Sequence, residues 1–515
     1  MGMRIKFDPL QSGQSRCDSS IEHPDSATQD SRIRESKAKN PMSSTQRESS
    51  TGTVEQSEVD VVIAGAGACG LIAAIRAAQL GASVALVEKL DHFDGDTTRS
   101  TGTIPAAGTR LQREAGITDN VDDMVADIER ITGPHDMTFL NRLLCEQSAP
   151  VVEWLMDHCG VRFKLYTTYM HIGHQTPRLH IQPGGKGMEL LDSLDQAVRR
   201  AGISIAYSTP VRQLLLDSEG RVTGVEVESA GVRRRILAKK TILASGGFGG
   251  NDALLREYCP EIAGAPFFGA PGSQGEAIEW GRALGARLAN IGAYQPHGSV
   301  AYPQRHLLTW SAAEMGAFYV NRSGKRFGNE NVGYSGFGAK VMAQNNEAYA
   351  IYDARIRDFI GENLETYKNL VKMGGAQEAA TVEQLAALHG IDAANLARTL
   401  ESYTRAAKGL APDEFGRTKF GMAPLVAPFV VTRVHACLFH TQGGLMVDAQ
   451  AHVMKTDGQP IPNLLAGGGA AACISGKSGG AGYVSGNGLL TASVLGYIAG
   501  ETAAREIADE KNSRG

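Results

Sequence analysis

Three glycines and one acidic residue form the first group in the chain whose types and spacing could bind a ligand. Gly65, Gly67 and Gly70 follow the pattern Gly-x-Gly-x-x-Gly, and Glu88 comes shortly afterwards. In this pattern the first glycine permits a tight turn, the second lets backbone amides approach a pyrophosphate, and the third lets a helix pack closely on a strand. An acid at the position of Glu88 can accept hydrogen bonds from ribose hydroxyls. These residues therefore predict a dinucleotide site.

The flanking segments supply the elements that such a site needs. Residues 60–64 are a short apolar, β-branched run, typical of a buried parallel strand, and residues 71–80 are an apolar helical run. A second strand is predicted at 83–87. The N-terminus of the helix would offer free N–H groups and a positive dipole end to the phosphates. The alternative is a tight strand–helix turn without a ligand. The motif alone does not distinguish FAD from a nicotinamide dinucleotide.

The composition argues against several classes of protein. The 515 residues are enough for two or three domains with large cores. The net charge of −4 gives no electrostatic reason to expect nucleic acid or an anionic membrane as a partner. The seven cysteines include no Cys-x-x-Cys pair, so zinc, iron–sulfur and c-type haem sites are not expected. Scattered cysteines suit a reducing cytoplasm. The sequence contains no apolar run of about 20 residues, so an integral membrane segment is not expected.

Four segments are predicted along the chain. Residues 1–55 are polar and are expected to be a disordered extension, with Met42 as an alternative start. Residues 56–295 form the first part of a cofactor-binding domain. Residues 296–435 are richer in Tyr, His and Arg and are expected to be an inserted domain. Residues 436–510 return to strands and glycine-rich loops and are expected to complete the cofactor domain.

Alternating and helical patterns give the expected elements in more detail. Strand-like alternation at 203–209, 211–217, 221–229 and 232–237 predicts a small antiparallel meander. A separate buried strand is expected at 240–244. Helices are expected at 139–159, broken at Pro150, and at 347–359, 381–388 and 393–409.

Five ordered segments resemble the flavoprotein family of fumarate reductases, succinate dehydrogenases and 3-ketosteroid dehydrogenases. They are residues 60–70, Ala-Ser-Gly-Gly-Phe-Gly-Gly-Asn at 244–251, Val-Asn-Arg-Ser-Gly-Lys-Arg-Phe-Gly-Asn-Glu at 320–330, His-Thr-Gln-Gly-Gly at 440–444 and the glycine-rich end at 467–490. The resemblance covers nearly everything from residue 59 to about 506. It implies an α/β fold, in which a Rossmann-type FAD-binding domain with a parallel sheet and an antiparallel meander carries an inserted α+β cap domain. The cap would close over the isoalloxazine ring.

The resemblance implies FAD as the cofactor and a set of residues that hold it. These residues are Gly65, Gly67, Ala68, Gly70, Glu88, Lys89, Thr97, Ser100, Thr101, Gly102, Ala107, Gly108, Val211, Ala244, Ser245, Gly246, Asn251, Asp252, Gly469, Asn487, Gly488, Leu489 and Leu490. Non-covalent binding is expected, because the loop at 95–102 contains no histidine.

Two departures from the family pattern bear on the substrate. Fumarate reductases have one arginine four residues after the glutamate that corresponds to Glu330 and a second arginine near the C-terminus. The corresponding residues here are Tyr334 and Tyr483. A guanidinium binds two carboxylate oxygens through its planar fork. A phenol instead donates one hydrogen bond to a ketone oxygen, or removes a proton as phenolate if its pKa is lowered.

The pair Tyr483 and Ser485 resembles the 3-ketosteroid 4-dehydrogenase branch, which has a tyrosine and a serine at this spacing. The expected reaction is α,β-dehydrogenation of a ketone, a 3-ketosteroid or related cyclic ketone, by α-proton abstraction and β-hydride transfer to FAD N5. Tyr483 is the expected donor to the carbonyl. Tyr334 or Ser485 would take the proton, and the sequence does not assign which. The partners would be the ketone and an external electron acceptor, namely a quinone, a diffusing carrier or oxygen.

Two alternatives stay open. His440 stands where fumarate reductases have a carboxylate-binding histidine, although it could equally be a half-buried histidine bonded to the backbone. The alternative enzyme is a fumarate-reductase-like reductase or dehydrogenase of an unsaturated or polycarboxylic acid, with charge from Arg305, Arg322 or Arg433. The alternative outside catalysis is a flavin-binding subunit that needs a partner for electron transfer, or a binder without turnover.

Two aromatic clusters could line a pocket or simply anchor loops on the core. One contains Tyr166, Tyr169, His171 and His174, and the other contains Tyr294, His297 and Tyr302. Lys325 and Arg326 are expected to serve a turn and the surface.

Overall fold

The computed structural model describes residues 56–168 and 170–513. The predicted extension at 1–55, with Met42, lies outside the described residues, and so does Tyr169. Within them the predicted α/β fold is confirmed. In this part of the chain no helix is both long and apolar enough to cross a membrane.

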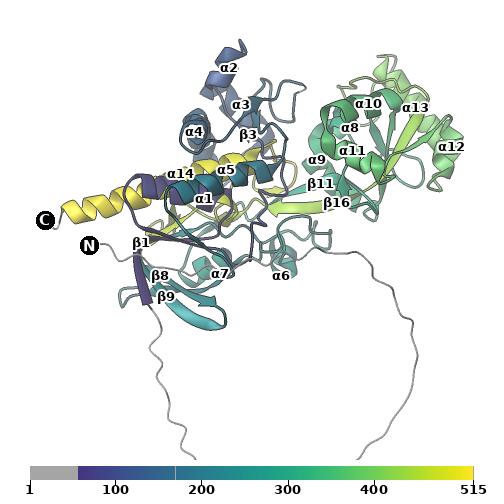
Figure 1. The fold of residues 1–515 in the computed structure, drawn as a ribbon. Helices are drawn as coiled ribbons and strands as arrows, with labels where there is room; N and C mark the ends of the chain where they lie inside the picture. The colour runs from purple at the N-terminus through teal and green to yellow at the C-terminus, as the bar shows by residue number, and fades with distance from the viewer. Residues whose placement is uncertain (1–55, 169, 514–515) are drawn as a thin grey trace, which may run out of the picture. The chain divides into compact units, whose positions relative to one another are not determined.

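The first glycine motif follows a central strand of an eight-stranded sheet (Figure 1). β1 (Gln56–Ala64) lies between β2 (Val84–Val87) and β9 (Val232–Leu243) and pairs with both in parallel. β19 (Pro460–Ala466) extends the sheet beyond β9, and β6 (Ile205–Ala206) extends it beyond β2, again in parallel. The C-terminal half of β1 is fully buried, which explains its unbroken apolar sequence.

Three helices pack beside this sheet: α1 (Ala68–Gln79), α5 (Gly187–Arg200) and the long α14 (Asn487–Asn512) (Figure 1). Two glycines allow α14 to lie very close to α1. A Cβ at Gly496 would come 2.6 Å from the Cys69 carbonyl oxygen, and a Cβ at Gly500 would come 2.4 Å from that of Ala73. The last helix of the chain is therefore tied to the helix that follows the glycine motif.

The meander differs from the prediction in two ways. β7 (Val211–Leu216), β8 (Val222–Ser229) and β9 are antiparallel neighbours as expected. The strand predicted at 203–209 is wrong in length and place, because only Ile205–Ala206 is extended and it pairs with β2 in the parallel sheet. The two strands predicted at 232–237 and 240–244 are one strand, which becomes buried only where it enters the parallel sheet.

A second sheet is antiparallel along its main path, in the order β12–β11–β16–β14–β13. These strands are β12 (His306–Leu307), β11 (Gly292–Ala301), β16 (Phe429–Thr441), β14 (Ala348–Asp353) and β13 (Phe318–Val320). Its buried side chains form a hydrophobic cluster distinct from that of the first sheet. The boundaries of an inserted domain at 296 and 435 stay a prediction.

Helices surround the second sheet. They are α8 (Ser311–Glu314), the 3₁₀ turn η1 (Glu330–Val332), α9 (Gly333–Met342), α10 (Ala354–Asn363), α11 (Glu365–Lys372), α12 (Val382–Ala387) and α13 (Ala393–Ala407), with the edge strand β15 (Gln377–Ala379). The helix predicted at 347–359 is wrong in its first half, which is β14. β14 pairs with β13 on one edge and with β16 on the other, and all its side chains are buried. Its apolar run therefore has no strand-like alternation.

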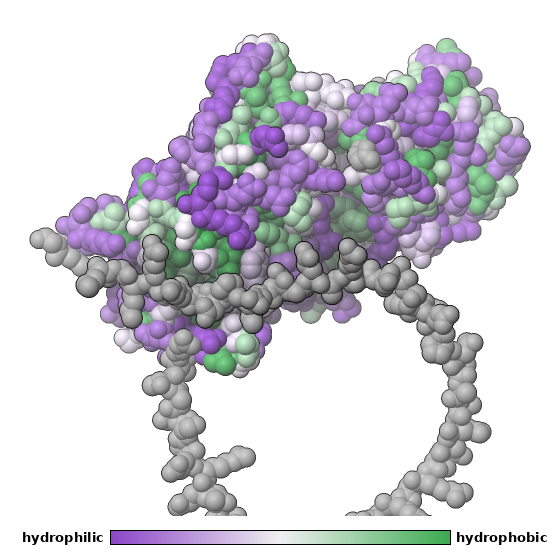
Figure 2. Space-filling model, viewed as in Figure 1, coloured by the Kyte–Doolittle hydropathy of each residue, from purple (hydrophilic) through white to green (hydrophobic). Residues whose placement is uncertain are grey.

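The remaining elements connect these layers. They are β3 (Ile104–Pro105), α2 (Arg110–Glu114), α3 (Val121–Thr132), α4 (Thr138–Asp157), β4 (Lys164–Leu165), β5 (Leu179–Ile181), α6 (Asp252–Tyr258), α7 (Glu276–Ala283), β10 (Leu288–Ala289), β17 (Gly444–Leu445), β18 (His452–Met454), the 3₁₀ turn η2 (Gly468–Ala470) and β20 (Ser478–Gly479). The break predicted at Pro150 is wrong, because α4 continues through it; the buried residues on both sides, such as Leu144 and Val151, hold the helix although proline removes one helical hydrogen bond. The face seen in Figure 2 is mainly hydrophilic around these helices.

A buried ion-pair network fixes the start of α9. Glu330 accepts hydrogen bonds from Arg326 Nη2 (2.6 Å) and Arg417 Nη1 (3.1 Å), and Arg326 also pairs with Asp413. All four side chains are at most 3% exposed. The expectation that Arg326 serves the surface is therefore wrong. Its partners Asp413 and Arg417 lie far away in sequence, so no local pattern indicated the burial.

Replacing Arg417 by methionine should lower the free energy of unfolding by about 3 kcal/mol, because Glu330 loses a partner inside the protein. Arg417 also donates to the carbonyl oxygens of Ala313 and Ala317, which would lose their donors. Denaturant unfolding measures the change. The control is Arg322→Met, which removes a pair to Glu347 whose arginine is 60% exposed and should cost below about 1 kcal/mol. Equal losses in the two variants would contradict a stabilising role of the network.

Candidate active site

A cavity of about 350 Å³ is lined by the glycine motif and by an aromatic group from the second sheet. Its lining includes Gly65 and Gly67 from the turn before α1. It also includes Tyr334 from α9, His440 from β16 and Tyr483 from the loop before α14. One cavity therefore contacts both the predicted cofactor motif and the predicted catalytic residues.

The three motif glycines have different surroundings. A Cβ at Gly65 would lie 2.4 Å from the Ala244 carbonyl oxygen, and a Cβ at Gly70 would lie 1.9 Å from that of Gly65. A Cβ at Gly67 would meet nothing within 4 Å. Gly65 and Gly70 are thus required by packing, whereas Gly67 leaves open space at the N-terminus of α1, where no side chain caps the helix. An anionic pyrophosphate suits such a position.

The acid of the motif is fixed at the cavity wall by the backbone. Glu88 Oε2 accepts a hydrogen bond from the N–H of Ala66 (2.8 Å), and Oε1 accepts one from the N–H of Leu90 (3.0 Å). Each carboxylate oxygen keeps a lone pair for another donor. The carboxylate is therefore oriented in the way that ribose recognition requires.

Buried polar atoms without partners also fit a flavin. Ser245 Oγ lines the cavity and has no hydrogen-bond partner among the residues that the structure describes. Asn487 is fully buried, and both its side-chain oxygen and nitrogen lack partners within the same residues. Buried polar groups are normally hydrogen-bonded, and leaving one unpaired costs roughly 1–3 kcal/mol. Together with the space at Gly67, the Ser245 hydroxyl at the cavity wall fits FAD, whereas Asn487 lies outside the lining.

The cavity contacts most, but not all, of the residues predicted to hold FAD. The lining contains Gly65, Gly67, Ala68, Glu88, Lys89, Thr97, Ser100, Thr101, Val211, Ala244, Ser245, Gly246, Gly469, Gly488 and Leu489. It does not contain Gly70, Gly102, Ala107, Gly108, Asn251, Asp252, Asn487 or Leu490. Gly70 and Gly102 instead lie against neighbouring protein atoms, and Asn251 caps α6. The individual assignments stay predictions.

The four residues predicted to be catalytic line the same cavity although they come from distant parts of the sequence. Tyr334 Oη lies 3.5 Å from Ser485 Oγ. The rings of Tyr334 and Tyr483 meet edge to face, with centroids 5.9 Å apart, and those of His440 and Tyr483 meet in the same way at 5.8 Å. Two phenols, one hydroxyl and one imidazole therefore surround a common space.

Burial sets the protonation of both phenols. It raises the pKa of Tyr334 to about 12, and it raises the pKa of Tyr483 well above its ordinary value. A hydrogen bond from the Gly488 backbone opposes part of the rise at Tyr483. The lowered pKa that a resting phenolate would need is therefore not found. At neutral pH both tyrosines are hydrogen-bond donors.

His297 belongs to the wall beside Tyr334, whereas the sequence analysis considered it only as one member of an aromatic cluster. Its ring stacks on that of Tyr334 at a centroid distance of 4.8 Å and an angle of 14°. Burial lowers the pKa of His297 to about 3, so the ring is neutral. Trp310 and Phe439 complete this aromatic wall. A helical or strand pattern could not have indicated the stacking, because it depends on the crossing of α9 and β11.

Gln442 and Ser475 orient His440, and both were missed from the sequence. Ser475 Oγ donates to Gln442 Oε1 (2.6 Å), and Gln442 Nε2 donates to His440 Nδ1 (2.7 Å). His440 Nδ1 is thereby an acceptor, which places the ring proton on Nε2. Burial also lowers the pKa of His440. The histidine is thus a neutral donor at the cavity wall rather than a cation.

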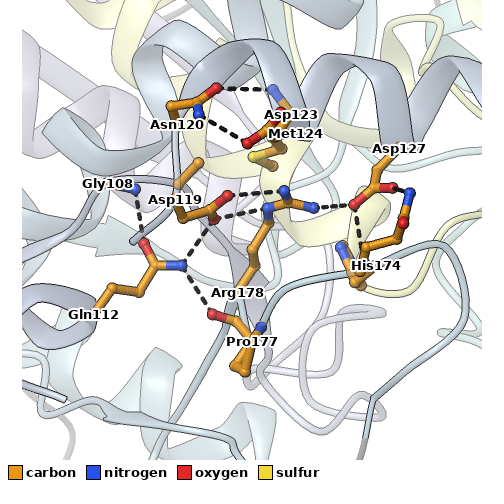
Figure 3. A network of polar contacts seen from close by, with 12 residues as sticks. Gly108, Gln112, Asp119, Asn120, Asp123, Met124, Asp127, His174, Pro177 and Arg178 are labelled. Atoms are coloured by element: carbon orange, nitrogen blue, oxygen red, sulfur yellow. Dashed lines mark hydrogen bonds and ion pairs between the residues drawn. The ribbon is translucent and has the colours of Figure 1, made fainter. Parts of the chain in front are cut away.

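The segment that holds Ser485 is anchored by a second buried network (Figure 3). His174 Nε2 donates to the Ser485 carbonyl oxygen (2.9 Å). Four residues on, Arg178 pairs with Asp119 (2.8 Å) and with Asp127, which also accepts from the N–H of Gln175 (2.9 Å). These charged side chains are at most 2% exposed. His174 is therefore a positioning residue that lies outside the cavity lining, while Tyr166 and His171 from the same predicted cluster do line it.

The cavity has few cations, and both are paired with acids. Among the described lining residues only Lys89 and Arg99 carry cationic side chains, and they pair with Glu276 and Asp94. Arg305, Arg322 and Arg433, the charges considered for an acid substrate, do not line the cavity. Arg322 and Arg433 pair with Glu347 instead.

Comparisons with known proteins give the family. A family model described as an FAD binding domain matches residues 60–489. An NADH:fumarate oxidoreductase of Klebsiella pneumoniae is 30% identical over 453 residues, which is 87% of this chain and 48% of that protein. The chain thus spans about half the length of this relative.

Two solved structures share the fold and 28% of the sequence. An open conformation of a flavocytochrome c3 fumarate reductase matches with a TM-score of 0.73, over 87% of this chain and 78% of that one. A 3-ketosteroid-Δ4-(5α)-dehydrogenase from Rhodococcus jostii RHA1, in complex with 4-androstene-3,17-dione, matches with a TM-score of 0.72 over 89% and 99%. The predicted flavoprotein family and the predicted FAD are both confirmed.

Replacing Gly67 by alanine should leave the protein folded but weaken FAD binding by about tenfold to a hundredfold. The added methyl group would enter the space open to the pyrophosphate, so that one or two charge-assisted hydrogen bonds would be lost. Titration of the apoprotein with FAD measures the affinity, and circular dichroism checks the fold. Gly361→Ala, in α10, is the matched control, since a Cβ at this position would meet only the side chain of Tyr367, 3.9 Å away. Wild-type affinity in Gly67→Ala would show that the pyrophosphate lies elsewhere.

Proposed function

The chain belongs to the FAD-binding domain family of flavoproteins, and we propose that it is an oxidoreductase that dehydrogenates a ketone between its α and β carbons. The substrate class is a 3-ketosteroid or related cyclic ketone. The observation that carries the proposal is the meeting of Tyr334, Tyr483 and Ser485 in a cavity whose cationic side chains, among the described lining residues, are both paired with acids. FAD, when bound, accepts the hydride that leaves the β-carbon.

Tyr483 holds the carbonyl oxygen in this proposal. Its phenol is protonated, and the backbone of Gly488, in the first turn of α14, contacts the same phenol. Both groups line the cavity. The phenol O–H and the N-terminal end of a long helix together favour negative charge on the ketone oxygen as the α-proton leaves. This stabilises the enolate more than the ketone, which is the condition for catalysis.

Tyr334 and Ser485 take the α-proton. The serine hydroxyl lies 3.5 Å from the phenol oxygen of Tyr334, so a proton received by one can pass to the other. The pair is held from both sides, by the Glu330 network before α9 and by the His174 contact to the Ser485 backbone. The basic form of this pair is the Tyr334 phenolate.

The charges of the cavity favour a ketone over an acid. A dicarboxylate needs cationic or multiply donating partners to offset its desolvation. The two buried histidines at this end, His297 and His440, both have lowered pKa values and are neutral. The ligand in the Rhodococcus structure is itself a 3-ketosteroid. The fumarate reductases among the relatives support the acid as the alternative substrate class.

The electron acceptor is an external one, a quinone, a diffusing carrier or oxygen. FAD is proposed to be bound without a covalent bond, since the loop at 95–102 has no histidine.

Steroid and cyclic ketones should bleach the bound FAD under anaerobic conditions, whereas succinate-like acids should not. Tyr483→Phe should slow bleaching by about a hundredfold or more, the usual loss of an oxyanion donor. Tyr334→Phe should slow it by about a hundredfold or more through loss of the base. Tyr302→Phe, an exposed tyrosine outside the cavity, is the control. Bleaching by acids alone, or wild-type rates in both cavity variants, would overturn the proposal.

The rate of bleaching should rise about tenfold per pH unit between pH 7 and 10 without a plateau. Since burial raises the pKa of Tyr334 to about 12, the phenolate is a small fraction that increases with pH throughout this range. The histidines add no change there, because their pKa values are lowered. Stopped-flow measurements at saturating ketone test the profile. A rate that is constant from pH 7 to 10 would exclude the phenolate as the base.

A further inference from the structure

Glu276 and Trp280 belong to α7 and both line the cavity. They are four residues apart in the helix, so their side chains lie on the same face. Lys89, which directly follows Glu88, lines the cavity as well and forms an ion pair with Glu276. Its side chain packs closely on the segment before α7, since a Cβ at Gly272 would lie 3.0 Å from Lys89 Cε. An acid and an indole therefore form part of the wall next to the residue that follows Glu88.

One carboxylate oxygen of Glu276 is paired, and the other is not. Oε1 accepts a hydrogen bond from Lys89 Nζ (2.5 Å). Oε2 is shielded from solvent and has no hydrogen-bond partner in the part of the chain that the structure describes. Because a buried charged group without a partner is costly, a hydrogen-bond donor on a bound ligand would stabilise this oxygen.

Close packing fixes the backbone at the start of α7. The residue before Glu276 is Gly275, with φ +87°, and a Cβ there would lie 2.5 Å from Leu254 Cδ1. Asn251 Nδ2 donates to the carbonyl oxygen of Gln274 (2.9 Å). Since the helix start and Lys89 both restrain Glu276, its carboxylate has a defined position at the cavity wall.

The order of the lining residues indicates which part of FAD this carboxylate would meet. Gly67 leaves space for the pyrophosphate, and Glu88, the predicted ribose acceptor, is bonded to the N–H of Ala66 beside it. Lys89 continues the wall from Glu88 to Glu276. In FAD the adenine is joined to this ribose on the side away from the pyrophosphate. Adenine carries a 6-amino group, which is a hydrogen-bond donor.

We propose that Glu276 selects adenine by accepting, through Oε2, a hydrogen bond from the 6-amino group of FAD. Trp280 offers the base an apolar aromatic surface beside this acceptor. A dinucleotide whose base carries an oxygen in place of the amino group is rejected, because two acceptors then face each other. The inference concerns the cofactor and is independent of the ketone chemistry.

The test uses full-length apoproteins and two dinucleotides, FAD and its deaminated analogue, in which hypoxanthine replaces adenine. Wild type is compared with Glu276→Gln, with Glu276→Asp and with the matched control Glu279→Gln, an exposed acid of the same helix. Isothermal titration calorimetry measures each affinity, and circular dichroism checks the fold. Because the two ligands carry the same pyrophosphate, changes of charge near it cancel in the ratio of their affinities.

Wild type should bind FAD about tenfold to a hundredfold more tightly than the deaminated analogue. In Glu276→Gln the ratio should fall to within about threefold, because an amide can donate to the hypoxanthine oxygen as well as accept from the adenine amino group. Glu276→Asp, whose carboxylate is drawn back, should show an intermediate ratio, and Glu279→Gln should keep the wild-type ratio.

Two results would overturn the assignment. One is equal affinity of the wild-type protein for the two dinucleotides. The other is a loss of affinity in Glu276→Gln by the same factor for both ligands, which would identify Glu276 as a support of the cavity wall or a partner of the ribose. Both results leave the proposed ketone chemistry untouched.

Discussion

The pairing of Glu330 with two buried arginines is the interaction on which the second half of the site depends. A carboxylate at this depth is stable only with full compensation, and Arg326 and Arg417 provide it. Arg417 reaches in addition to the backbone of α8, so one charge cluster sets α8, the η1 turn and α9 relative to each other. The position of Tyr334, four residues after Glu330, is a consequence of this cluster.

A buried arginine paired with carboxylates also supports the opposite side of the site. Arg178 is compensated by Asp119 and Asp127, and the segment before it carries His174, whose ring holds the Ser485 backbone. The short separation of Tyr334 Oη and Ser485 Oγ is thus fixed by two buried arginine–carboxylate clusters that share no residue. Reactive groups are best placed on elements that several interactions hold in position, because small displacements lower the reaction rate by large factors.

Local features of this fold could be predicted from the sequence, and non-local pairings could not. The strand, turn and helix around Gly65 follow from composition over about 25 residues, and the family resemblance selected Tyr334, Tyr483, Ser485 and His440, which all line one cavity. The misassigned strand β14 shows the limit, since a strand buried on both faces has the apolar pattern of a helix. The role of Gln442 was likewise missed, although the residue lies in the segment 440–444, because that role depends on a contact with Ser475.

The replacement of arginine by tyrosine changes more than the hydrogen-bond donor. It leaves no arginine beside the neutral histidines His297 and His440, and burial raises the pKa of both phenols. In the proposed function, the same burial disfavours a dicarboxylate, keeps Tyr483 a hydrogen-bond donor and makes Tyr334 a strong but rarely ionised base. Substrate selection and alkaline rate dependence are in this way two results of one physical cause, the low polarity of the cavity around the tyrosines.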